Sequence, residues 1–161
     1  MAAGIKIKIN HITDKPMVSL LYEASSRGVP VDLLVRGNSS LVTGVKGISD
    51  NIRVHAIIDR FLEHSRIFIF ANGGNPLYFM GSADWMPRNL YNRIEVITPV
   101  YDSAIQQDLQ RIVDWGLADN QKAVYANGSG EYLKIVPSAG QKAFRSQEAL
   151  YRYYCEKDVQ D

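Results

Sequence analysis

The spacing of apolar residues changes twice within residues 5–35, and this change constrains the fold more than any other feature of the chain. Residues 5–9 alternate isoleucine with lysine, as in a strand with one buried and one polar face. Residues 16–28 then follow helical spacing, and residues 31–35 form a short apolar run typical of a buried strand. A strand, a helix and a strand in this order predict a β-α-β unit, so we expect an α/β fold with parallel strands.

The length and charge of the chain favour one compact domain over residues 1–161. With 46% hydrophobic residues, the chain is long enough for one core and too short for two ordinary domains. Its formal net charge of +1 gives no overall basic field of the kind that non-specific nucleic-acid binders use. We therefore expect no nucleic-acid partner and only a local anion site. Because a strand begins so close to the first residue, the chain reads like a domain excised from a longer one.

Cysteine content and hydropathy indicate the compartment. Cys155 is the only cysteine, which excludes an internal disulfide and a zinc cluster built from thiolates. The start of the chain lacks the apolar core of a signal peptide, and no apolar run is long enough to span a bilayer. We expect a cytoplasmic protein without a transmembrane segment, either dissolved or peripheral to the inner membrane.

The rest of the chain alternates further helices and strands. Residues 54–62 return to helical spacing, so we expect a second helix to lead into His64. Residues 66–70 and 77–80 flank an Asn-Gly-Gly-Asn-Pro turn and predict a hairpin. Later elements are an alternating strand over 93–98 in which Arg93 and Glu95 form an ion pair, a helix capped by Asp102 or Ser103, a hairpin of 123–125 with 132–135, and a helix from Ser146.

His64 and Arg66 stand at the head of the predicted strand 66–70. Side chains alternate between the faces of a strand, so both residues project to one side and can contact the same ligand. Imidazole can carry a proton near neutral pH, and guanidinium binds an oxyanion through two parallel hydrogen bonds. A phosphoryl group is the natural ligand of this pair, although His-x-Arg alone is a weak pattern and also fits a solvated strand end.

Two further basic residues are candidates for the same anion site. Arg36 follows the strand 31–35, and ligands of open α/β sheets bind beyond the carboxyl ends of parallel strands. Gly37 next to it lets the backbone come close to an anion. Lys6 and Lys8 share the polar face of the first strand. We interpret Lys6 as protecting an edge strand, whereas Lys8 lies nearer the carboxyl end and points towards a ligand.

The segment after the first hairpin is expected to return beside His64. Its Ser82 and Asn89 can donate hydrogen bonds to phosphate oxygens or orient the imidazole, and Arg88 is expected to face the anion. Asp84 fits two interpretations equally well. It is either a partner of His64 or of an arginine, or a turn residue.

The His-x-Arg strand followed by Gly-Ser-x-Asp resembles one half of a phospholipase D-type site, in which His-x-Lys and Gly-Ser-x-Asn motifs face each other across two halves. The chain departs from that pattern at Arg66, Ala71 and Asp84. Over most of residues 5–150 it is more similar to the C-terminal catalytic domain of bacterial polyphosphate kinase type 1. The segments that carry this resemblance are 34–37, 47–53, 60–67, 70–74, 81–89 and 147–150. The resemblance implies a phospholipase D-like α/β/α sandwich with a mixed, partly parallel sheet.

The resemblance to polyphosphate kinase also implies an activity. It implies reversible transfer of the terminal phosphate of ATP to inorganic polyphosphate, with ADP as product and Mg²⁺ as cofactor. In that family the phosphorylated histidine and the metal ligands lie in the preceding domain, which is therefore an expected partner, and the full-length form is expected to be a homo-oligomer. The resemblance assigns nucleotide-phosphate contacts to Arg36 and His64, with His64 stabilising or protonating the transferring group. The isolated domain is expected to be inactive.

Two other functions fit the same residues. One is a homodimeric phospholipase D-like phosphodiesterase or nuclease, in which two copies of His64 meet across a two-fold axis. The other is a non-catalytic phosphate-binding or docking module, because a fold alone does not specify a reaction.

Overall fold

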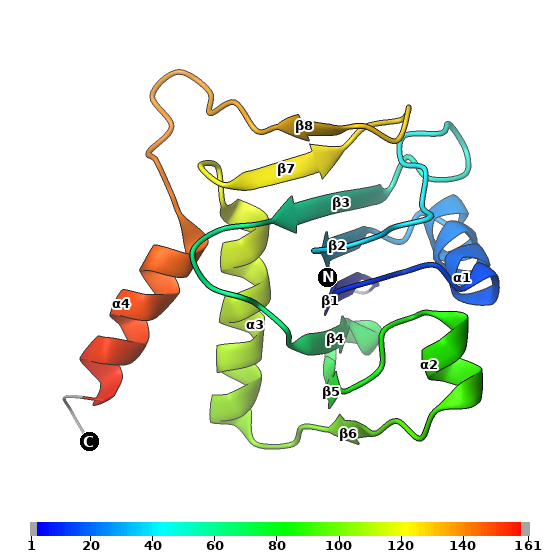
Figure 1. The fold of residues 1–161 in the computed structure, drawn as a ribbon, viewed down its shortest axis with the longest axis horizontal. Helices are drawn as coiled ribbons and strands as arrows, with labels where there is room; N and C mark the ends of the chain where they lie inside the picture. Colours follow the sequence, from blue (N-terminus) through cyan, green and yellow to red (C-terminus); the bar gives the residue numbers. More distant parts are fainter. Residues whose placement is uncertain (1–2, 159–161) are drawn as a thin grey trace.

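The computed structural model describes residues 3–158, which form one eight-stranded sheet with helices on both faces. The strands are arranged in the order β6-β5-β4-β1-β2-β3-β7-β8 (Figure 1). They are β1 (Ile5–Ile9), β2 (Val31–Val35), β3 (Ile52–Ile57), β4 (Arg66–Phe70), β5 (Leu77–Gly81), β6 (Ile97–Pro99), β7 (Ala123–Ala126) and β8 (Tyr132–Lys134). The helices are α1 (Lys15–Ser26), α2 (Pro87–Asn92), α3 (Ser103–Ala118) and α4 (Ser146–Asp158), and the 3₁₀ turn η1 (Asn72–Gly74) joins β4 to β5.

The predicted β-α-β unit is present. Strands β1, β2 and β3 are parallel, whereas β4 pairs with β1, and β7 with β3, in the antiparallel sense. Asp14 caps α1 by accepting a hydrogen bond from the Met17 N–H, and Pro16 occupies the first turn, where a missing N–H costs nothing. Gly28 ends the helix with a positive φ of 81°, a conformation that glycine adopts without strain. The mixed, partly parallel sheet expected from the sequence is confirmed.

Two apolar layers hold the helices against opposite faces of the sheet. The α1 face buries β-strand residues together with Val18 and Leu21, and the α3 face buries others together with Leu109 and Val113. Strand β2 contributes to both layers, because alternate side chains such as Leu33 and Leu34 point to opposite sides. Figure 1 shows α1 and α3 on the two sides of the sheet, with α4 packed outside α3. The expected α/β/α sandwich is therefore confirmed.

The prediction of a helix over residues 54–62 is wrong. Residues Ile52–Ile57 form β3, which is hydrogen-bonded to β2 on one side and β7 on the other. The apolar residues that suggested a helix do not share a buried face, because Ile58 is 77% exposed and Leu62 is 75% exposed. The chain reaches His64 through an irregular loop, residues 58–65.

Two smaller expectations also fail. Lys6 does not protect a sheet edge, because β1 lies in the middle of the sheet between β4 and β2, and Lys6 instead pairs with Asp114 of α3 at 2.6 Å. The strand expected over 93–98 is reduced to β6, and within residues 3–158 no ion pair joins Arg93 to Glu95. The carboxylate of Glu95 instead accepts hydrogen bonds from the side chains of Ser82 and Asn89.

Candidate functional site

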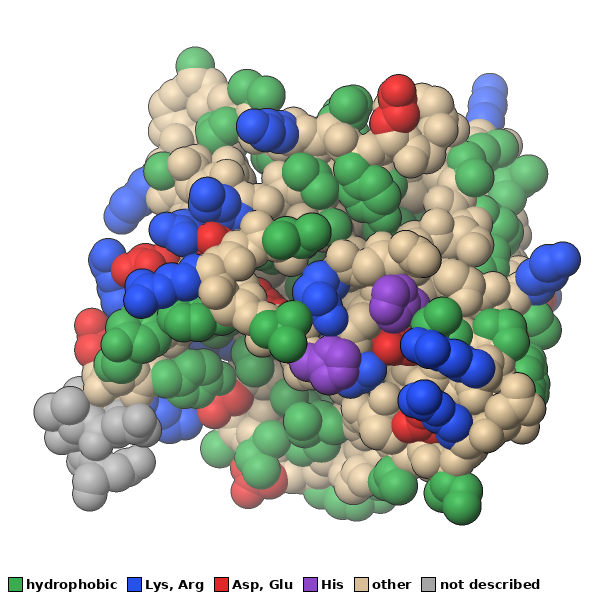
Figure 2. Space-filling model, viewed as in Figure 1, with side chains coloured by type: hydrophobic (Ala, Val, Ile, Leu, Met, Phe, Trp, Pro, Cys, Tyr) green, Lys and Arg blue, Asp and Glu red, His purple; other side chains and the backbone are tan. Residues whose placement is uncertain are grey.

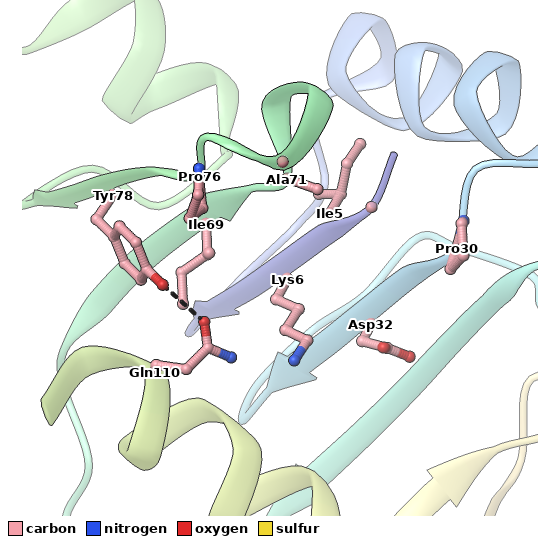
Figure 3. Close-up of a pocket in the computed structure, with 11 residues that line it drawn as sticks. Ile5, Lys6, Pro30, Asp32, Ile69, Ala71, Pro76, Tyr78 and Gln110 are labelled. Carbon is pink, nitrogen blue, oxygen red and sulfur yellow. Dashed lines mark hydrogen bonds between the residues drawn. The ribbon is translucent and has the colours of Figure 1, made fainter. Parts of the chain in front are cut away.

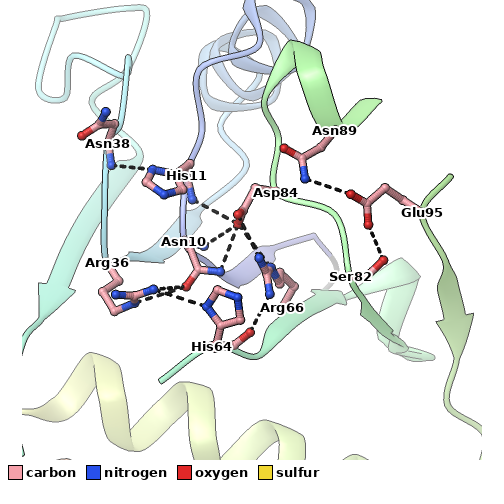
Figure 4. Close-up of polar contacts among 10 residues, drawn as sticks. All are labelled: Asn10, His11, Arg36, Asn38, His64, Arg66, Ser82, Asp84, Asn89 and Glu95. Carbon is pink, nitrogen blue, oxygen red and sulfur yellow. Dashed lines mark hydrogen bonds and ion pairs between the residues drawn. The ribbon is translucent and has the colours of Figure 1, made fainter. Parts of the chain in front are cut away.

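Arg36 and His64 lie side by side at the carboxyl edge of the parallel strands. Arg36 directly follows β2, and His64 lies two residues before the start of β4, which runs antiparallel to the neighbouring β1. Arg36 Nη2 lies 3.3 Å from His64 Nδ1 (Figure 4). The His64 side chain is exposed and Arg36 is half-buried, so both can reach a ligand from solvent. The structure thus brings together the two residues from which the sequence predicted an anion site.

Asn10, which the sequence analysis did not single out, fixes the guanidinium of Arg36. Its Oδ1 accepts hydrogen bonds from Arg36 Nε at 3.2 Å and from Nη2 at 3.1 Å. Asn10 directly follows β1, so it occupies the same carboxyl edge as Arg36. That position is the signal by which the sequence could have indicated it.

Asp84 is the centre of a buried polar network beside this pair. Its Oδ1 accepts hydrogen bonds from the backbone N–H groups of Asn10 and His11, at 2.9 and 3.2 Å. Its Oδ2 accepts one from Arg66 Nη2 at 2.9 Å, and Arg66 Nη1 donates to the carbonyl of His64. Burial by itself raises the pKa of Asp84, but the hydrogen bonds from Arg66 and Asn10 outweigh burial and lower it. Asp84 is therefore an ionised partner of an arginine, one of the two interpretations that the sequence allowed.

Arg66 consequently differs from Arg36 in its availability. Its side chain is 11% exposed and is held by the carboxylate of Asp84. An arginine that is neutralised in this way attracts an anionic ligand less strongly than an arginine whose partner is an uncharged amide. The geometry makes Arg66 a support for the backbone at His64.

Lys8 is buried behind the site. It pairs with Glu63 at 3.2 Å, and the two residues line a small hollow together with Arg36. Burial lowers the pKa of Lys8, Glu63 acts in the opposite direction, and the nearby Arg36 adds to the lowering. Lys8 therefore adds positive charge beneath the site, but its side chain is 8% exposed and its ammonium group is already paired with Glu63.

Ser82 and Asn89 lie in a separate cluster. Both donate hydrogen bonds to the carboxylate of Glu95, and their recorded side-chain bonds within residues 3–158 do not reach His64 or Arg36 (Figure 4). Both bonds lower the pKa of Glu95, and the bond from Ser82 has the larger effect. Arg88 is exposed on the first turn of α2. The structure therefore does not join Ser82 or Asn89 to the imidazole, which was one of the two roles that the sequence offered for them. The other role, hydrogen bonding to phosphate oxygens, stays a prediction.

His11 holds the loop that carries Arg36. Its Nδ1 accepts a hydrogen bond from the Asn38 N–H at 3.0 Å, and its ring packs against Gly37. A side chain on Gly37 would begin 2.4 Å from His11 Cε1 and 2.9 Å from the Asn10 carbonyl oxygen. Glycine is needed here for space, since its φ is not positive. The close approach fixes the direction in which Arg36 leaves the strand.

The loop that carries His64 is held by the start of α4 through polar contacts. Arg145 binds Asp59 through two hydrogen bonds of 2.7 and 2.6 Å, and lowers the pKa of that carboxyl group. Gln147 accepts a hydrogen bond from the Phe61 N–H at 2.7 Å and donates to Glu63 at 2.8 Å. Much of this loop is exposed and has little apolar packing to hold it. These polar contacts therefore fix the backbone that leads to His64.

The surface around the site is basic. Figure 2 shows histidine, lysine and arginine side chains gathered near the middle of one face. Within residues 3–158 no group of three or more His, Cys, Asp or Glu side chains could hold a metal ion. The same part of the chain contains no helix that is long and apolar enough to cross a membrane.

A larger hollow of about 280 Å³ lies at the opposite edge of the sheet (Figure 3). Its cation, Lys6, is engaged by Asp114, and Tyr78 donates a hydrogen bond to Gln110 at 3.1 Å. Asp32 also lines it. With its lysine paired and a further carboxylate present, this hollow is a poor anion site compared with the edge at Arg36.

Comparison with known proteins gives the family. The family model described as "Polyphosphate kinase C-terminal domain 2" matches residues 1–147. The chain belongs to this family. The Polyphosphate kinase of Escherichia coli K12 is 46% identical over 155 residues, and that of Thermosynechococcus vestitus is 48% identical over 158 residues. These matches cover 95% and 98% of the chain but only 22% and 21% of the relatives, so this family member spans about a fifth of their length.

Solved structures support the same assignment. The polyphosphate kinase from Porphyromonas gingivalis superposes with a TM-score of 0.93 at 42% identity, covering 99% of the chain and 24% of that protein. NucT from Helicobacter pylori superposes with a TM-score of 0.56 at 17% identity, covering 71% of the chain and 79% of that protein. The second likeness concerns the fold alone.

Proposed function

We propose that the chain works as the C-terminal domain of a polyphosphate kinase that reversibly transfers the terminal phosphate of ATP to inorganic polyphosphate. The contact between Arg36 and His64 carries this proposal, because it places a guanidinium and an imidazole 3.3 Å apart at an exposed edge. Family membership supplies the reaction. ATP, ADP and polyphosphate are then the ligands, and another domain of a longer protein supplies the phosphorylated histidine.

The two side chains suit phosphoryl transfer. In the forward half-reaction a nitrogen–phosphorus bond forms on the free imidazole of the histidine that becomes phosphorylated, while the bond between the terminal phosphorus and the bridging oxygen breaks, and ADP leaves with the bonding electrons. Arg36 neutralises charge on the oxygens of the transferring group. His64 donates a hydrogen bond or a proton to an oxygen of that group, which an imidazole can do near neutral pH. In-line placement and charge neutralisation account for most catalysis of this kind.

The remaining candidate residues contribute unequally in this proposal. Lys8 and Arg66 support the site from behind, because each is buried against a carboxylate. Arg88 is exposed and can meet a long polyanion. Ser82 and Asn89 donate hydrogen bonds to a ligand only if their hydrogen bonds to Glu95 break.

Our proposal assigns magnesium to no site within this domain. The described residues hold no cluster of carboxylates and imidazoles that could bind a metal ion. We therefore place the metal ligands in the rest of the longer protein and derive no step that involves the ion. Homo-oligomer formation also belongs to that longer protein in this proposal.

The phosphodiesterase alternative is disfavoured by Arg66. That reaction needs a cation available to phosphate two residues after the histidine, and Arg66 is instead held by Asp84 at 2.9 Å. The docking-module alternative keeps the fold and predicts no dependence of activity on Arg36 or His64.

The test is polyphosphate synthesis from ATP by the full-length protein. Arg36→Ala and His64→Ala are each expected to lower kcat/KM by about 100-fold, the usual scale for removing a group that stabilises transition-state charge. Arg27→Ala is the matched control, because Arg27 is an exposed arginine that directly follows α1 and, within residues 3–158, forms its ion pair with Glu23. Its rate should equal that of the unchanged protein. Unchanged rates in both site variants would contradict the proposal and favour the docking module.

A further inference from the structure

Asn10 lies between Arg36 and Asp84, and the structure determines which way its amide faces. The residue is 1% exposed. Its Nδ2 lies 3.1 Å from Asp84 Oδ1, and its backbone N–H donates to the same oxygen. A carboxylate only accepts hydrogen bonds, so the NH₂ group must face Asp84 and the carbonyl Oδ1 must face Arg36 (Figure 4).

Asp84 is in turn prevented from rotating. Arg66 donates to both of its oxygens, from Nε at 3.3 Å and from Nη2 at 2.9 Å. This fork geometry gives the carboxylate a single orientation. The order of contacts is therefore Arg66, Asp84, Asn10 and Arg36, and each group orients the next.

The contacts of Arg36 leave one side of its guanidinium for a ligand. Nε and Nη2 both donate to Asn10 Oδ1, and Nη2 also approaches His64 Nδ1. Among residues 3–158, Arg36 Nη1 has no recorded hydrogen-bond partner. An uncharged amide fixes the group without neutralising it, so Arg36 keeps its full charge for an anion. A carboxylate in the same place would fix the group and compete with phosphate.

We propose that Asn10 is a positioning residue for phosphate binding, acting through Arg36. It holds the guanidinium in one rotamer before the ligand arrives, which removes part of the entropy cost of ordering a long side chain on binding. This inference rests on the proposed function, since it assumes that Arg36 contacts the phosphates of ATP.

The test is a double-mutant cycle in the full-length protein, with KM for ATP and kcat measured in polyphosphate synthesis. Asn10→Ala should raise KM by about tenfold, the scale expected for losing hydrogen bonds to a charged group. In the Arg36→Ala background the same replacement should change KM by less than about twofold, because its effect passes through Arg36. A general loss of structure would act equally in both backgrounds.

Two further variants make the result decisive. Ser25→Ala also removes a buried hydrogen-bonding group, at the opposite edge of the sheet, and should lower the melting temperature without raising KM. Asn10→Asp keeps the volume of the side chain, and it replaces Asn10→Ala in the KM measurement if Asn10→Ala does not fold. A carboxylate there would neutralise Arg36 and repel Asp84, so KM should again rise about tenfold.

The outcomes separate the two proposals. If Arg36→Ala raises KM but neither Asn10 variant does, or if the effects of Asn10→Ala and Arg36→Ala simply multiply, the positioning proposal is overturned and the function stands. If Arg36→Ala leaves KM and kcat unchanged, both proposals fall.

Discussion

Arg66 faces Asp84 across 2.9 Å in a part of the molecule almost closed to solvent, their side chains being 11% and 7% exposed. Neither charge can be removed alone without leaving the other buried and unpaired. The same carboxylate orients Asn10, so this ion pair connects the stability of the domain to the geometry at Arg36.

The first prediction concerns the free energy of unfolding. Arg66→Met should lower it by about 3 kcal/mol, because an uncompensated carboxylate remains buried. Adding Asp84→Asn should recover part of this loss, since the amide oxygen still accepts from the backbone of Asn10. Urea unfolding followed by circular dichroism measures both values. Equal stability of Arg66→Met and the unchanged protein would contradict the prediction.

The second prediction concerns pH. The pKa of Asp84 is lowered in the folded state, so its ionised form contributes stability above the ordinary aspartate pKa of about 3.9. This contribution is lost as the pH falls through the lowered pKa. The stability difference between the unchanged protein and Asp84→Asn should therefore shrink below about pH 4. Urea unfolding at a series of pH values tests this, with the exposed Asp50→Asn as the control whose difference should stay small. A difference that grows on acidification would refute the assignment.

The third prediction concerns the loop of residues 58–65. Gln147→Ala removes the hydrogen bonds to Phe61 and Glu63, so this loop should open more often while the sheet stays folded. Amide hydrogen exchange at Phe61 should accelerate by about tenfold, corresponding to loss of hydrogen bonding worth about 1.4 kcal/mol. Arg152→Ala, which removes an exposed pair with Glu148 on the same helix, is the control. Equal acceleration in β1 amides would instead indicate global unfolding.

The fourth prediction concerns the space at Gly37. A methyl group there would meet the His11 ring and the backbone of Asn10, so Gly37→Ala should cost about 1–3 kcal/mol and raise KM for ATP by displacing Arg36. Gly128→Ala is the matched control, because its methyl group would meet the Thr43 carbonyl oxygen at 3.2 Å in the turn between β7 and β8, away from the site. It should lower the melting temperature and leave KM unchanged. A KM that rises equally in both variants would show that crowding acts through general stability.

Local patterns were reliable where neighbours along the chain supply the partners. The cap at Asp102, the turn through Asn72–Gly74 and the hairpin of β7 with β8 all depend on residues close in sequence. The pattern over 54–62 was misleading, because apolar residues of a strand and of the loop that follows it can fall by chance at the same spacing as the buried face of a helix. Pairing of β3 with both β2 and β7 stabilises the strand, and those partners lie far away in the sequence.

The order of apolar and polar residues was sufficient to predict the β-α-β unit and to place Arg36 and His64 at the ends of elements, because these preferences act within a few residues. The contact between them, and the arrangement of Asn10, Asp84 and Arg66 behind it, depend on β1 lying between β2 and β4. That strand order results from burying both faces of the sheet under α1 and α3. Hydrogen bonds between residues as distant as Asn10 and Asp84 form only after this packing, so no local pattern contains them.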